Sequence, residues 1–159
     1  MAINKAISII VFGMAILFIG SQCLFAEENL YSDEIVKEIS NNVSEEYITC
    51  AAYFSIVSEA MRRSGDAEVA SKYEAYRDLA VQYALIAAKE GRTQEMAERV
   101  SLARFELNVK SMTNEIDNDI GNISILLNKY SARCKEIMED PEKVMVEWGD
   151  KILEKHKLK

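Results

Sequence analysis

The sequence has 159 residues, of which 49% are hydrophobic and 28% charged, and 26 acidic against 19 basic residues give a net charge of −7. This length suits one domain with a single hydrophobic core. An acidic chain gains nothing from neutralising phosphates, so we expect no nucleic acid among its partners.

The first 26 residues have the three-part pattern of a secretory signal peptide. Lys5 is the only charge before an apolar run from Ala6 to Gly20, and the small Ala26 precedes Glu27. We expect cleavage after Ala26, which leaves residues 27–159 as a single domain. Because only Lys5 is lost among the charged residues, the net charge changes from −7 to −8. The pattern predicts a periplasmic or secreted protein.

Two other interpretations of this segment exist. Residues 6–26 are just long enough to span a bilayer, which takes about 20 apolar residues. Retention as an anchor is therefore an alternative, although Ser21, Gln22 and Ala26 favour cleavage, after which no stable membrane anchor remains. Cys23 suggests a lipoprotein, but Gln22 is bulky and polar where that processing favours a small residue.

Two amphipathic helices are predicted over residues 32–63 and 66–90. Ser32 and Asp66 are suited to cap them, and Gly65 and Gly91 to end them. The short link makes the two helices antiparallel neighbours. Their apolar positions follow a spacing of three and four residues: Val36, Ile39, Val43, Tyr47, Cys50, Phe54, Val57 and Met61, then Val69, Tyr73, Tyr76, Ala80, Tyr83 and Ala87.

Residues 93–139 keep this helical spacing throughout, so the period alone allows a single helix of about 70 Å. The turn and capping residues at 117–122 instead predict two helices, 93–117 and 120–139. Pro141 then begins a short helix over residues 141–155. The expected fold class is all-α, an antiparallel four-helix bundle with a short C-terminal helix.

Cys50 and Cys134 are the two cysteines that follow the signal segment. An even number in an exported protein predicts a disulfide, and two buried free thiols are the alternative. Counted from Ser32 at about 1.5 Å per residue, Cys50 lies about 27 Å along the bundle. Cys134 lies at about 29 Å if the chain reverses at 118–121, and at about 70 Å if it does not. The bridge and the reversal are therefore predicted together.

The motifs argue against catalysis and against a bound metal or cofactor. His156 is the only histidine, and the sequence has neither the paired Glu-x-x-His of di-iron bundles nor Cys-x-x-Cys-His for haem. Asp117 and Gly121 suggest a calcium loop, but the positions of Gly121 and Asn128 do not match one. The neighbouring Glu45 and Glu46 fall on a solvated face. We expect a non-enzyme without cofactor or metal, in which His156 is a solvated tail residue.

Four tyrosines on the first two predicted helices form a candidate ligand seam. Buried tyrosines need partners for their hydroxyl groups, so several together can line a small, partly polar pocket. Ordinary packing with the hydroxyl groups at the rim is the alternative. The residues are Tyr47, Tyr73, Tyr76 and Tyr83.

The third predicted helix has a second apolar face, formed by Met96, Val100, Ala103 and Leu107. An exposed apolar stripe indicates a protein partner or self-association. Alternatively, the C-terminal helix covers the stripe and Trp148 closes one end of the bundle; Trp148 could also anchor a partner. The sequence thus predicts an exported, non-catalytic bundle acting through protein contacts, or alternatively a binder of a small apolar or aromatic ligand.

Overall fold

The computed structural model describes residues 32–157, and all regular structure within this range is helical. The predicted all-α class is confirmed, whereas the predicted signal peptide lies outside the described residues. No helix between residues 32 and 157 is long and apolar enough to cross a membrane. The elements are α2 (Asp33–Arg63), α3 (Ala67–Ala88), α4 (Gln94–Glu115), a 3-10 turn η1 (Ile120–Asn122), α5 (Ser124–Glu139) and α6 (Pro141–Lys157).

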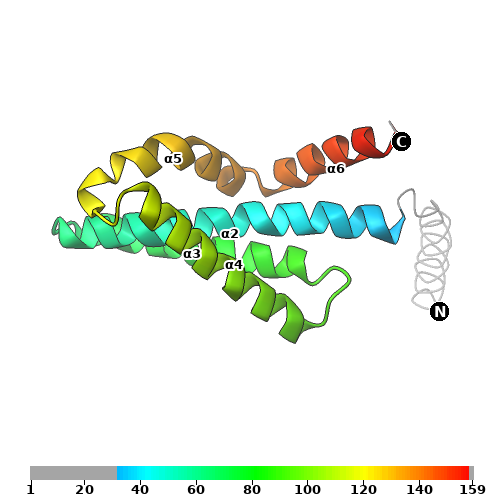
Figure 1. Ribbon diagram of the computed structural model, residues 1–159, viewed down its shortest axis with the longest axis horizontal. Coiled ribbons are helices and arrows are strands. Elements are labelled where there is room, and N and C mark those ends of the chain that lie inside the picture. Colours follow the sequence, from blue (N-terminus) through cyan, green and yellow to red (C-terminus); the bar gives the residue numbers. More distant parts are fainter. Residues whose placement is uncertain (1–31, 158–159) are drawn as a thin grey trace, which may run out of the picture. The chain divides into compact units, whose positions relative to one another are not determined.

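The central element is α2, which contacts the four other α-helices of the described range. Helices α5 and α6 lie on one side of it, and α3 and α4 lie on the other (Figure 1). Its first turn is acidic and its last turn basic, which suits the helix dipole. α2 supplies most of the large core residues, and its middle third is buried on almost all sides. The large core residues of α2 are Val43, Tyr47, Ile48, Tyr53, Phe54, Ile56 and Val57.

Helix α3 packs closely against α2 because it presents small side chains to it. Ala80, Ala84 and Ala88 are fully buried, which leaves room for the rings of α2. Asp66 caps α3 by accepting a hydrogen bond from the backbone N–H of Val69 at 3.0 Å. The predicted antiparallel pair is confirmed.

The chain reverses after α4, as predicted. Asp117 and Asn118 have φ angles of 56° and 58°, in the left-handed region that Asn and Asp tolerate better than most residues. The N–H of Asn118 donates to the carbonyl of Thr113 at 2.9 Å, which closes the last turn of α4. Asp119 then caps η1 by accepting from the N–H of Gly121 at 2.9 Å. Because η1 intervenes, α5 begins at Ser124 rather than at residue 120.

Helices α5 and α6 follow one another along the same side of α2 (Figure 1). Val144 and Ile152 of α6 are buried. α6 packs chiefly on α2 and α5, so the alternative in which it covers the second face of α4 is wrong. Trp148 closes no end of the bundle either, because its indole N–H donates to Glu46 in the middle of α2, at 2.9 Å.

Candidate functional site

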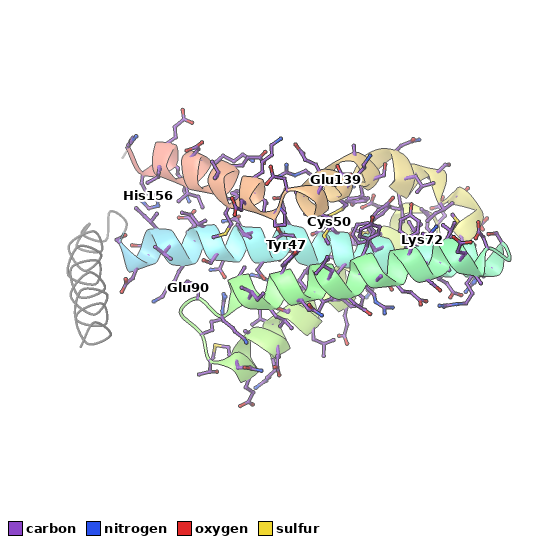
Figure 2. All side chains as sticks on the ribbon, turned by 180° about the vertical axis from the view of Figure 1, so that it is seen from behind. Tyr47, Cys50, Lys72, Glu90, Glu139 and His156 are labelled. Carbon is purple, nitrogen blue, oxygen red and sulfur yellow. A yellow bond between two sulfur atoms is a disulfide. The ribbon has the colours of Figure 1, made fainter. Side chains whose placement is uncertain are left out.

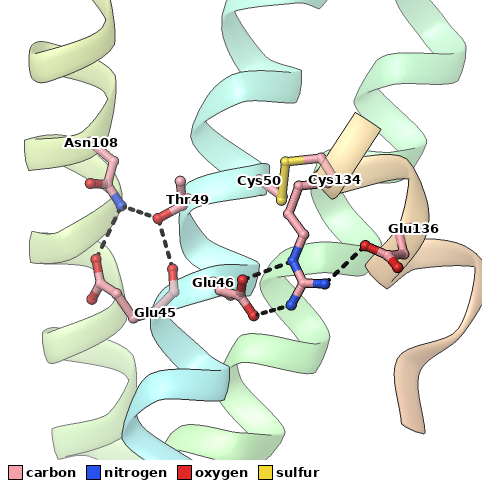
Figure 3. Close-up of a disulfide and its surroundings, with 8 residues drawn as sticks. Glu45, Glu46, Thr49, Cys50, Asn108, Cys134 and Glu136 are labelled. Atoms are coloured by element: carbon pink, nitrogen blue, oxygen red, sulfur yellow. Dashed lines mark hydrogen bonds and ion pairs between the residues drawn. A yellow bond between two sulfur atoms is a disulfide. The ribbon is translucent and has the colours of Figure 1, made fainter. Parts of the chain in front are cut away.

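The structure brings Cys50 of α2 and Cys134 of α5 to disulfide distance, as predicted. The sulfur atoms are 2.06 Å apart and the Cα atoms 5.3 Å apart (Figure 3). This Cα separation lies within the usual range for a disulfide. Both cysteines are buried. The bridge joins α2 to α5, the first α-helix after the reversal at residues 117–119.

Next to the bridge, Arg133 of α5 binds three carboxylates from three helices. Its guanidinium donates to both oxygens of Glu46, at 2.9 and 3.0 Å, in a bidentate pair. It also donates to Glu136 at 2.9 Å (Figure 3). A further hydrogen bond runs to Glu147 at 2.6 Å. Together with the indole of Trp148, this Arg133 cluster fixes α5 and α6 to α2.

The charges in the Arg133 cluster shift one another's pKa values. The pKa of Arg133 is raised, chiefly by its hydrogen bonds to Glu46. The hydrogen bond from Arg133 lowers the pKa of Glu147. The pKa of Glu136 is lowered most by its hydrogen bond to Lys143 and further by the one to Arg133. Arg133, Glu136 and Glu147 thus favour one another's charged forms.

The two glutamates expected on a solvated face both have partners, and the Glu45 side chain stays 45% exposed. Glu46 lies in the Arg133 cluster, while Glu45 pairs with Arg104 of α4 at 3.0 Å and accepts from Asn108 at 3.4 Å (Figure 3). Nothing in the local sequence indicates these contacts, because the partners are distant along the chain. His156 is likewise no free tail residue, since it lies 3.1 Å from Glu38.

The predicted tyrosine seam exists, but it is divided into two separate cavities. One, of about 270 Å³, lies between α2, α3 and α5 and includes Tyr73 and Tyr76. The other, of about 240 Å³, includes Tyr47 and Tyr83, whose ring centroids are 5.2 Å apart. The sequence could not predict this division, because residues of α5 and α6 complete the two cavities. Figure 2 shows Tyr47 close to Cys50 along α2.

The two cavities differ in how their buried hydroxyl groups are bonded. Tyr47 donates to the carbonyl of Pro141 at 3.3 Å. The hydroxyl of Tyr53, in the larger cavity, makes no hydrogen bond of normal geometry, although Tyr53 is only 1% exposed. The larger cavity is therefore the better candidate for a ligand site.

Both buried tyrosines should ionise late. Burial raises the pKa of Tyr47 and of Tyr53 to about 12, from the ordinary value of 10.0. Since a raised pKa in the folded state favours the neutral form, their contribution to stability is complete below pH 10 and is lost as the pH rises toward 12. Burial also raises the pKa of Tyr130, so a titration followed by tyrosinate absorbance should show a set of late tyrosines that loses one member in Tyr53→Phe. Ionisation of all tyrosines in one step near pH 10, with the protein still folded, would contradict this.

The second face of α4 is uncovered, and we call Met96, Val100, Ala103 and Leu107 the α4 surface. The side chains of Met96 and Leu107 are 54% and 66% exposed. The core face of α4 lies opposite, with Ala97, Ser101 and Met112 buried. The structure thus removes the alternative in which α4 is covered on both sides by other helices of the chain.

Within residues 32–157, no group of three or more His, Cys, Asp or Glu side chains is placed to hold a metal ion. Comparisons with protein-family models, with curated proteins and with solved structures find no match to this chain. The chemistry of the cavities and of the α4 surface therefore carries the functional argument.

Proposed function

We propose that this protein is an exported, non-catalytic helical bundle that acts through protein–protein contacts, with the α4 surface as its contact and a second copy of the chain as its partner. The exposure of large apolar side chains along the α4 surface is the observation that carries this proposal. Export is supported by the signal-like N-terminus and by the cysteine pair, since disulfides persist in oxidising compartments.

The spacing of the α4 surface is symmetric, which suits a pair of identical helices. Its residues follow one another at intervals of four, three and four. When two copies of α4 run antiparallel, Met96 faces Leu107 of the second copy, and Val100 faces Ala103 of the second copy. Each of these two contacts then occurs twice in the dimer, as a two-fold symmetric interface requires. This spacing is also that of helices that pack knobs into holes.

The charges beside the α4 surface favour the antiparallel arrangement. Arg99 and Glu106 lie on the same flank, about two turns apart, and antiparallel pairing places Arg99 of each copy next to Glu106 of the other. A parallel pair would place Arg99 next to Arg104 of the second copy instead. No ion pair within residues 32–157 engages Arg99 or Glu106, so both are available for the contact.

Sedimentation equilibrium of the purified, disulfide-bonded protein tests this proposal. The wild type should form a dimer, and Leu107→Glu should weaken it by more than about 100-fold, because two charges enter the apolar contact. Ile86→Glu is the matched control, since Ile86 is 68% exposed but lies on α3. It should leave the dimer unchanged.

A charge exchange then tests the orientation. Arg99→Glu should weaken the dimer about tenfold, because two attractive pairs become repulsive. Arg99→Glu combined with Glu106→Arg should restore it. A wild type that remains monomeric at its highest soluble concentration, or a dimer indifferent to Leu107→Glu, would refute the proposal.

A further inference from the structure

The larger cavity lies where α2, α3 and α5 meet, one turn beyond the disulfide. Its volume is about 270 Å³. Four aromatic rings from α2 and α3 form one wall, and residues of α5 form the other. The lining residues are Tyr53, Phe54, Tyr73, Tyr76, Ser131, Ala132, Lys135, Met138 and Glu139.

The aromatic wall is built around Phe54. Its ring centroid lies 5.3 Å from that of Tyr53, 6.0 Å from Tyr73 and 5.5 Å from Tyr76, all in tilted arrangements. Such contacts hold aromatic rings in fixed orientations. The wall is therefore a preformed apolar surface that another flat ring can pack against.

The hydroxyl of Tyr53 gives this wall a polar point. It is buried and makes no hydrogen bond of normal geometry, and a buried hydroxyl without one costs about 1–3 kcal/mol. Tyr73 and Ser131 also line the cavity, and their hydroxyl groups lie close enough to that of Tyr53 to act on its pKa through hydrogen bonding. A molecule in the cavity can supply a hydrogen bond of better geometry.

The mouth of the cavity carries no unbalanced charge. Lys135 and Glu139 both lie there, and they pair with each other at 3.8 Å. Neither an organic cation nor an anion therefore meets an unpaired opposite charge. An aromatic ring fits the volume, since an apolar protein cavity of about 150 Å³ can bind benzene.

From these observations, the geometry points to a binding site for a small, neutral aromatic compound with one hydroxyl or N–H group, of the size of phenol or indole. The ring packs on Phe54 and its neighbours, and the polar group bonds to the hydroxyl of Tyr53. This inference is independent of the α4 surface, which lies on another helix.

The test is an NMR titration of the full-length protein with phenol, and with toluene as a probe that has the ring but no hydroxyl. Phenol should shift the resonances of residues lining the cavity. Tyr53→Phe, which removes only one oxygen atom, should weaken phenol binding about tenfold and leave toluene binding unchanged. Equal effects on both probes, or no effect on phenol, would overturn the role of the Tyr53 hydroxyl.

A second pair of variants locates the site. Ala132→Phe fills the larger cavity from its exposed edge and should abolish binding of both probes. Ala87→Phe, which fills the smaller cavity instead, is the matched control and should change neither. Binding of phenol that survives Ala132→Phe, the absence of phenol binding to the wild type, or tighter binding of tetramethylammonium than of phenol would each overturn the inference.

Discussion

Replacing Cys50 and Cys134 together by alanine should lower the free energy of unfolding by about 4–5 kcal/mol, the largest effect we expect from any change in this chain. The bridge closes a loop of 84 residues, and its removal increases the conformational freedom of the unfolded chain. Urea denaturation under non-reducing conditions measures the loss. For a single domain, this is a large share of the total stability.

Reduction of the wild type provides the control for the cysteine variant. A reducing agent should shift the denaturation midpoint of the wild type to that of the double-alanine variant, and it should not affect the variant. A wild type whose midpoint is insensitive to the reductant would mean that the thiols are free. The bridge would then be absent from the protein in solution.

Replacing Arg133 by methionine should lower the free energy of unfolding by about 2 kcal/mol at neutral pH. The side chain is only 31% exposed, and its removal leaves three carboxylates from three helices without their shared cation. Lys135→Met is the matched control. Among residues 32–157, Lys135 pairs only with Glu139 on an exposed surface, so this change should stay within about 0.5 kcal/mol.

The pH dependence of stability distinguishes the Arg133 cluster from simple packing. The pKa values of Glu136 and Glu147 are lowered in the folded state, so their contribution is present above their ordinary value of 4.5 and is lost as the pH falls through the folded-state pKa. The wild type should therefore lose more stability than Arg133→Met on acidification. Parallel pH curves for the two proteins would contradict this account.

The helices could be predicted from the sequence because their signals are local. Apolar spacing, the capping residue Asp66 and the turn at 117–119 lie within a few residues of the boundaries that they set. The disulfide followed from these boundaries, since a fixed rise per residue places Cys134 level with Cys50.

The contacts between distant segments could not be predicted in the same way. Glu46 and Arg133 are ordinary surface residues by composition, and only the folded chain brings them together. The path of α6 along α2 depends on these contacts and on Trp148. The division of the tyrosine seam has the same origin, because α5 and α6 contribute residues to different cavities.

A distance measurement between two copies of α4 tests the proposed self-association most directly. A spin label at Asn114, in a Cys23→Ser background under non-reducing conditions, leaves the α4 surface intact. In the antiparallel dimer, Met96 faces Leu107, so Asn114 of one copy lies level with position 89 of the other. The two labels are therefore about 25 residues apart along the helix axis, which is about 37 Å. A distance of about 10 Å, as between parallel packed helices, or no dipolar coupling between labels, would contradict the account.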